Sequence, residues 1–150
     1  MKKHLLLIIT SLFLLFSCQD DNNSVESKNN FTVQEIGKGV RLGHFLTQQN
    51  TVITNSAQWN TFLTEIDSSS NFSSTFTETN IDFNQFMLIA VVDEVRTSGG
   101  YTIDIISVTE TTQNIEVVVD NLQKGNFTTI ITQPFHIVKI PKIAKPVVFN

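Results

Sequence analysis

The chain has 150 residues, a formal net charge of −4 and one cysteine. This length corresponds to one domain, and a single cysteine excludes a disulfide within one molecule. The chain has only ten Lys and Arg against fourteen Asp and Glu. It therefore lacks the basic face that nucleic acid requires, and we expect no nucleic-acid partner.

The amino-terminal end has the pattern of a secretion signal. Two lysines at positions 2 and 3 precede an apolar run over residues 5–15, which is shorter than the roughly 20 residues of a membrane-spanning helix. The run closes with Leu-Phe-Ser-Cys at residues 15–18, which resembles the lipobox of bacterial lipoprotein precursors. We therefore predict a signal peptide over residues 1–17, cleavage before Cys18, and lipid attachment, such as palmitate, on Cys18. The alternatives are an ordinary signal peptide with an incidental cysteine, or a buried cysteine in a cytosolic protein.

Residues 18–30 are predicted to form a disordered polar tether. From residue 19 onward the segment contains one apolar residue, Val25, and so cannot bury enough surface to fold. Its first residues, Gln-Asp-Asp at 19–21, resemble the acidic signal that sends some Gram-negative lipoproteins to the outer face of the outer membrane. A polar linker without sorting content is the alternative. We expect a cell-envelope protein held at a membrane through Cys18, with the outer membrane and surface exposure favoured by this signal.

Residues 31–150 are predicted to form a single β-rich domain. Residues 31–36 and 41–46 are short apolar segments separated by glycines, which favours an edge hairpin, and residues 51–54 are a further predicted strand. Five more segments have the alternating or continuous apolar pattern of strands. They are residues 86–92, 100–108, 115–119, 127–140 with an interruption at Pro134, and 147–149.

One amphipathic helix is predicted between the first strands and residue 68. Large apolar residues recur at i, i+3, i+4 and i+7, which places them on one apolar stripe of a helix. They are Trp59, Phe62, Leu63 and Ile66. Asn55 is the expected N-cap, and the residues that follow come close to a capping box. Residues 71–80 are predicted to be a loop. The fold class is therefore mainly β (α+β), an antiparallel β sandwich or roll with one packed amphipathic helix. The proline at 134 indicates an edge strand or a bulge.

Three short motifs follow one another in the second half of the chain. They are Asp82-Phe83 before a strand, Thr-Ser-Gly-Gly-Tyr at residues 97–101, and Pro-Phe-His-Ile-Val-Lys-Ile-Pro at residues 134–141. In order and spacing they resemble the PrcB family of lipoproteins, described as subunits of a protease complex, over residues 51–149. The family pattern is D-F, T-G-G-Y and P-Y-H-x-V-x-I-P. The sequence departs from this pattern at two positions. Ser98 is inserted or replaces a family residue, and Phe135 stands where Tyr is usual, which removes a hydroxyl group.

The resemblance implies a non-enzymatic accessory subunit that binds or stabilises a secreted or surface protease. The candidate partner-binding residues are Thr97, Gly99, Gly100, Tyr101 and Phe135. Adjacent glycines allow close backbone approach, and a neighbouring Tyr is typical of binding hot spots. The same residues also fit a tight turn with Tyr101 in the core.

Two other functions remain open from these residues. The loop resembles, more distantly, the Thr-Gly-Tyr loop of chagasin-type protease inhibitors, which implies direct inhibition of a protease. A surface module for carbohydrate or protein ligands is a third possibility.

Catalytic signatures are missing from the predicted domain. Its histidines are His44 and His136, and the second is expected to be packed or hydrogen-bonded in a strand. The sequence contains no G-x-S-x-G, no H-E-x-x-H and no phosphate-binding loop. The acidic and histidine residues lack metal-ligand spacing. We predict no enzymatic activity, no cofactor and no metal site.

Overall fold

The computed structural model describes residues 29–30 and 32–150. The predicted signal peptide, Cys18 and most of the predicted tether lie outside the described residues. Asn29–Asn30, the last two residues of the predicted tether, differ from the prediction because they form the short strand β1. No helix in the described part of the chain has the length and apolar character needed to span a membrane.

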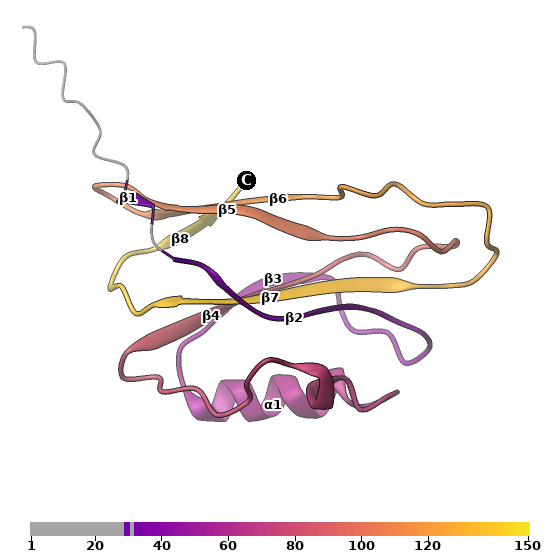
Figure 1. The fold of residues 1–150 in the computed structure, drawn as a ribbon, viewed down its shortest axis with the longest axis horizontal. Helices are drawn as coiled ribbons and strands as arrows, with labels where there is room; N and C mark the ends of the chain where they lie inside the picture. The colour runs from indigo at the N-terminus through magenta and orange to yellow at the C-terminus, as the bar shows by residue number, and fades with distance from the viewer. Residues whose placement is uncertain (1–28, 31) are drawn as a thin grey trace, which may run out of the picture.

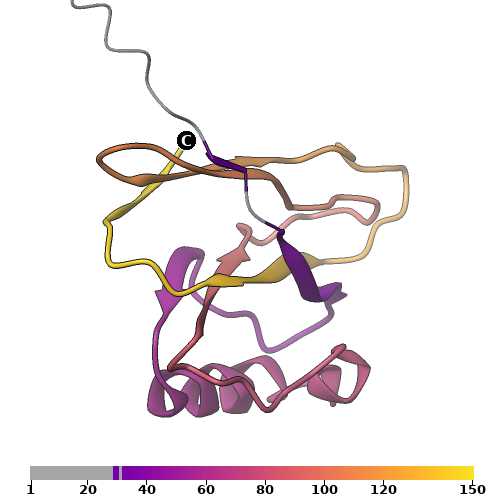
Figure 2. The ribbon, with the colours of Figure 1, turned by 60° about the vertical axis from the view of Figure 1, so that its left-hand side comes forward.

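Two four-stranded sheets and one α-helix form three stacked layers (Figures 1 and 2). The outer sheet has the order β1-β5-β6-β8, and the central sheet has the order β2-β7-β4-β3. Helix α1 covers the face of the central sheet that points away from the outer sheet. The predicted fold class, a β sandwich with one packed helix, is confirmed. The elements are β1 (Asn29–Asn30), β2 (Gln34–Arg41), β3 (Gln49–Ile53), α1 (Ser56–Ile66), the 3₁₀ helix η1 (Phe72–Thr75), β4 (Phe86–Val92), β5 (Asp104–Glu110), β6 (Ile115–Asp120), β7 (Gln133–Pro141) and β8 (Val147–Phe149).

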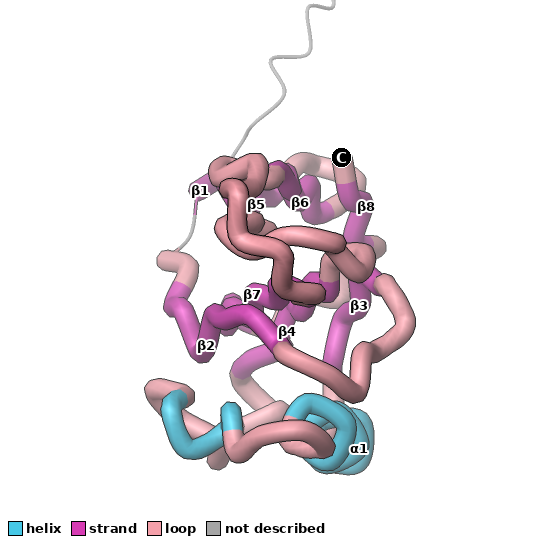
Figure 3. Tube along the Cα trace, turned by 90° about the vertical axis from the view of Figure 1, so that its right-hand side faces the viewer, coloured by secondary structure: helices cyan, strands magenta, loops and turns pink. Residues whose placement is uncertain are grey.

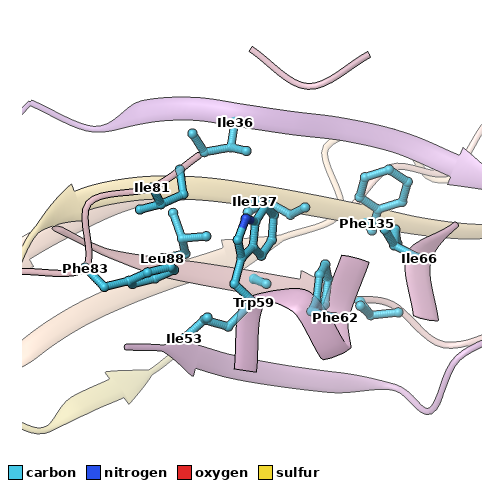
Figure 4. Close-up of a cluster of buried hydrophobic side chains, with 12 residues drawn as sticks. Ile36, Ile53, Trp59, Phe62, Ile66, Ile81, Phe83, Leu88, Phe135 and Ile137 are labelled. Carbon is cyan, nitrogen blue, oxygen red and sulfur yellow. The ribbon is translucent and has the colours of Figure 1, made fainter. Parts of the chain in front are cut away.

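The central sheet has a hydrophobic core on each of its faces. Alternate residues of β4 and β7 point to opposite faces, as the pleat of a strand requires. Leu88 and Ile137 pack with the helix residue Trp59 in the first core (Figure 4). Ile89 and Val138 belong to the second core, between the two sheets. The continuous apolar sequence of β4 is explained by this double burial.

Helix α1 begins as the sequence predicts. The side chain of Asn55 accepts a hydrogen bond from the backbone N–H of Gln58 at 3.0 Å. The Gln58 side chain accepts in turn from the backbone N–H of Thr54 at 2.9 Å, one residue before the cap. The Trp59 indole donates to the carbonyl of Thr79 at 2.8 Å and so fixes the helix to the segment between η1 and β4.

The predicted hairpin over residues 31–46 is wrong. Residues 34–41 form one strand, β2, which pairs along its length with β7 and has a bulge near Gly37. The glycines are required by packing rather than by a turn. A Cβ atom on Gly37 would collide with the ring of Phe76, and one on Gly39 would lie 3.0 Å from the ring of Phe135.

The prediction that Pro134 marks an edge or a bulge is also wrong. β7 lies inside the central sheet, between β2 and β4, and Pro134 is its second residue. The Pro134 carbonyl accepts from the Asp93 N–H at 2.9 Å. Pro134 has no N–H to return this bond, and the Asp93 carbonyl accepts instead from the Gln133 side-chain amide at 2.9 Å. A side chain thus replaces the missing backbone donor.

Two other strand boundaries differ from the predicted ones. Residues 127–131 form a loop, so β7 begins only at Gln133. β5 begins at Asp104, four residues later than predicted, and Tyr101 makes only an isolated bridge to Lys124. β8 is a strand as predicted, and it pairs parallel to β6.

Candidate functional site

Two long loops pair with each other at one end of the sandwich. The first, residues 93–103, joins β4 to β5, and the second, residues 121–132, joins β6 to β7. Arg96 and Thr132 exchange backbone hydrogen bonds of 2.7 and 2.9 Å. Further along, the Gly99 N–H donates to Thr128 at 3.0 Å. We call these segments the paired loops; they project at the right of Figure 1.

Gly99 and Gly100 allow the second loop to approach the first. The Gly99 carbonyl accepts from the Asn126 N–H at 2.9 Å. Gly100 has a φ of +77°, a conformation that side chains with a Cβ rarely adopt. A Cβ atom on Gly100 would also lie 2.7 Å from the Asn126 side chain. Gly100 is therefore needed for contact between the loops within this chain, and a Cβ atom on Gly99 would lie 3.3 Å from the Ile130 side chain.

Tyr101 lies between the two loops. Its half-buried ring packs against Gly125, where an added Cβ atom would be 2.5 Å away. The guanidinium carbon of Arg96 stands 4.7 Å from the ring centroid, in a cation–π arrangement. Tyr101 is therefore part of the contact that holds the loops together, neither at an exposed tip nor in one of the two cores.

A buried carboxylate anchors the base of the paired loops. Asp93 is 3% exposed. It accepts two hydrogen bonds from the Arg96 guanidinium, at 2.9 and 3.0 Å, and one from the Asn121 side chain at 3.0 Å. The hydrogen bonds to Asp93 raise the pKa of Arg96 above its ordinary value, and the charge of Glu94 acts in the same direction. Charged hydrogen bonds of this kind are stronger than neutral ones, so both loops start from a fixed point.

Exposed apolar side chains gather on the loops at this end. Phe127 is fully exposed, and Leu122 and Ile131 are more than half exposed. Seven of the twelve exposed large apolar side chains of the described residues lie here, which makes the end a candidate interaction surface. We call it the apolar end; its residues are Leu42, Phe45, Val95, Leu122, Phe127, Ile130 and Ile131.

The described chain enters the fold at the opposite end. β1 pairs with Glu110 and Thr109, the last two residues of β5, beside the turn to β6. The paired loops begin at the other ends of β5 and β6. The apolar end therefore faces away from the place where the preceding residues join the domain (Figure 1).

The predicted partner-binding residues separate into two groups. Thr97, Gly99, Gly100 and Tyr101 lie together in the first of the paired loops, where Thr97 is exposed. The prediction that Phe135 contacts a partner directly is wrong, because this residue is 1% exposed. Its ring packs in the core edge-on against η1, 5.4 Å from the Phe72 ring centroid.

Sequence reasoning missed the second loop, which carries the most exposed side chains. Residues 127–131 have the composition of a strand, with two isoleucines after Phe-Thr-Thr, and this concealed them. The usable signal was Phe127 directly after Gly125-Asn126, since an aromatic residue that follows a turn pair can stand at a loop tip.

His136 is packed and hydrogen-bonded, as the sequence predicts. It is 6% exposed, and its Nδ1 accepts from the backbone N–H of Ile105 at 3.0 Å. Within the described residues no three His, Cys, Asp or Glu side chains are grouped so as to hold a metal ion.

Comparison with known proteins gives one match. The family model described as PrcB C-terminal matches residues 87–141, which run from β4 to the end of β7 and include both paired loops. No curated protein and no solved structure matches the chain. Residues 87–141 are therefore similar to the PrcB C-terminal family, and the resemblance of the chain to the PrcB family is confirmed.

Proposed function

We propose that this protein is a membrane-anchored, non-enzymatic accessory subunit that binds and stabilises a secreted or surface protease. The match of residues 87–141 to the PrcB C-terminal model carries the proposal, because the family is one of protease-complex subunits. Lipid on Cys18 would hold the domain at the cell envelope, and the outer membrane is the location we favour.

The apolar end is the surface that we assign to the protease. The fully exposed aromatic side chain of Phe127 stands on a well-anchored loop, and such a side chain supplies contact area at low entropic cost. The Asp93–Arg96 ion pair and the Tyr101 contact hold the paired loops together before any partner binds. In this role Gly99, Gly100 and Tyr101 act by shaping the surface, while Phe127 and Leu122 would make the contacts.

Tagged full-length protein, cross-linked in intact cells, tests this proposal. It should recover a peptidase, and the peptidase should become less abundant in a strain without the protein. Replacing Phe127 and Leu122 by Ser should lower recovery about tenfold or more, as expected for hot-spot residues. A matched variant with Ile106 and Val118 changed to Ser removes exposed apolar side chains of the outer sheet and should not. Equal recovery by both variants would contradict the assignment of the surface.

A direct inhibitor is the second candidate. It is favoured by the paired loops with the fully exposed Phe127, together with the β2–β3 loop that carries Leu42 and Phe45. The recovered peptidase distinguishes the two. An inhibitor should lower its activity at a near-stoichiometric ratio, with loss of inhibition in the Phe127→Ser variant. An accessory subunit should leave the activity unchanged or prolong it at elevated temperature.

A further inference from the structure

One edge of the central sheet is an open strand. Among the described residues, β3 pairs only with β4, in the order β2-β7-β4-β3. Figure 3 shows β3 at the side of the sheet directly above α1. An edge strand presents unpaired N–H and C=O groups to any extended chain that lies beside it.

The hydrogen-bond pattern identifies the open groups. The Asp93 N–H donates to Pro134 on β7, and antiparallel bonding alternates along a strand. Val92 and Ala90 therefore direct their backbone groups toward β3, opposite Gln49 and Thr51. The intervening residues Asn50 and Val52 direct their backbone N–H and C=O groups outward, away from β4. No described residue forms a hydrogen bond to these groups.

The next outward group along the strand is already occupied. The Thr54 N–H donates to the Gln58 side chain of α1 at 2.9 Å. This bond shows that the outer side of β3 is accessible to a hydrogen-bonding partner. The open stretch of the edge therefore ends where α1 begins and is centred on Asn50 and Val52.

A groove runs beside this edge, between β3 and α1. One hollow of about 270 Å³ has the buried side chains of Ile53 and Phe62 in its lining. A second hollow of about 470 Å³ continues toward Phe45 and Leu46, and the two share Gln49 and Glu65. The two hollows therefore adjoin at these residues, the first beside β3 and the second beside the segment that precedes it. Its remaining lining residues are Thr47, Thr51, Val52, Gln58 and Thr61.

A carboxylate stands where the two hollows meet. Glu65 lines both of them. Among the described residues, none forms an ion pair with Glu65. In an extended peptide, a basic side chain two or four residues from an apolar one lies on the same face. Its charge would then stand near Glu65 while the apolar side chain packs on the apolar lining.

We propose that this groove binds an extended peptide segment whose apolar and basic side chains lie on the same face, and that the segment adds a strand to β3. Backbone bonds to Asn50 and Val52 would supply affinity, and the groove would read alternate side chains. The five residues of β3 correspond to about 17 Å of extended chain. The site goes beyond the proposed function, because it is distinct from the paired loops.

A synthetic peptide tests the proposal. The sequence KTVTVTK places valines on one face and a lysine at each end, so that either strand direction brings a lysine near Glu65. Fluorescein-labelled peptide and full-length protein in detergent should give a saturable rise in fluorescence anisotropy. The Asn50→Pro variant removes an outward N–H without breaking a bond to β4, and binding should weaken about fivefold, the value of one net hydrogen bond. Asn50→Ala keeps the N–H and should bind as the unmodified protein does.

The charge is tested by a second pair of changes. Glu65→Gln should weaken binding of KTVTVTK about threefold, as expected for an exposed ion pair. Glu65→Gln should leave binding of QTVTVTQ unchanged. The Phe127→Ser variant should bind KTVTVTK normally, which separates this site from the apolar end. Equal unfolding midpoints of all variants in urea establish that each variant is folded.

Three results would overturn the proposal. They are the absence of saturable binding by the unmodified protein, equal binding by the Asn50→Pro and Asn50→Ala variants, and self-association that Asn50→Pro abolishes. The last result, measured by sedimentation equilibrium, would show that a second copy of this chain occupies the edge instead of a peptide.

Discussion

The Nδ1 atom of His136 accepts a hydrogen bond from the backbone N–H of Ile105, with 3.0 Å between the two nitrogens. His136 lies on β7 of the central sheet, and Ile105 lies on β5 of the outer sheet. The register of β5 against β6 shifts between Ile105 and Ser107. A side chain of one sheet thus satisfies a backbone donor of the other at this bulge.

This bond predicts that the protein loses stability in acid. Burial is the main cause that lowers the pKa of His136 below its ordinary value, and Lys38 acts in the same direction against the carboxylates of Glu35 and Asp104. The pKa of a histidine in the unfolded chain is about 6.5. Above this pH, His136 is neutral in both the folded and the unfolded state, and its contribution to stability is fully present. As pH falls, the unfolded state takes up the proton first, so stability is lost down through the folded-state pKa.

Urea unfolding between pH 7.5 and 5 measures this effect. In the His136→Asn variant, whose amide oxygen can accept the Ile105 N–H, the corresponding part of the pH dependence should disappear. His44 is exposed, so His44→Asn should keep the full dependence. Identical pH profiles of the His136→Asn variant and the unmodified protein would contradict the assigned role.

Gly125→Ala should destabilise the paired loops through a collision with Tyr101. The added Cβ atom would lie 2.5 Å from the ring, at a φ of +93°. Gly43 supplies the matched control, because it has a φ of +73° and no heavy atom within 4 Å of an added Cβ. Gly43→Ala should therefore cost only the backbone term, about 1 kcal/mol. Gly125→Ala should lower the free energy of unfolding, measured in urea, by more than Gly43→Ala does. Equal losses would mean that the Tyr101 ring moves aside without cost.

Asp93→Ala should loosen both paired loops, because it leaves the Arg96 guanidinium and the Asn121 amide without their shared acceptor. We expect a loss of about 1–3 kcal/mol in the free energy of unfolding. Hydrogen exchange of the Gly99 and Asn126 amides, which bond across the loops, should become faster. Glu94→Ala removes an exposed partner of Arg96 and should change both measurements little. Unchanged exchange in the Asp93→Ala variant would place the loop anchor elsewhere.

Two phenylalanines should differ completely in their effect on folding. Phe127 is fully exposed and Phe135 is 1% exposed. Phe127→Ser should change the free energy of unfolding by less than about 0.5 kcal/mol. Phe135→Ala leaves a cavity beside the rings of Phe72 and Phe76 and should cost about 3–5 kcal/mol. Similar unfolding midpoints for the two variants would be inconsistent with these positions.

Local features of the sequence predicted the helix and most of the strands. The Asn55 cap and the apolar stripe of α1 depend on residues within one or two turns of each other, so they can be read directly. The glycines of β2 could not be read in this way. Gly37 and Gly39 make room for Phe76 and Phe135, which are distant in the sequence, and a local pattern of glycines favours a turn instead.

The candidate surface was predicted only in part. The sequence identified the first paired loop from the glycines and Tyr101, but most of the exposed apolar side chains of the apolar end belong to residues 121–132. The pairing of the two loops depends on the anchor at Asp93, a long-range contact. The prediction of an edge or a bulge at Pro134 failed for a similar reason. The side chain of Gln133 supplies the missing hydrogen-bond donor, and no local sequence pattern indicates that it does so.

β7 packs on both of its faces, and this has a consequence for how the sequence can change. Phe135 and Ile137 fill the core under α1, while Val138 and Ile140 fill the core between the sheets. A substitution at any of these four positions must fit closely packed surroundings, so neither face of the strand leaves them free to become polar. The segment Pro-Phe-His-Ile-Val-Lys-Ile-Pro should therefore accumulate amino-acid substitutions more slowly than the solvent-facing strands. It should remain recognisable in sequences whose other residues have diverged.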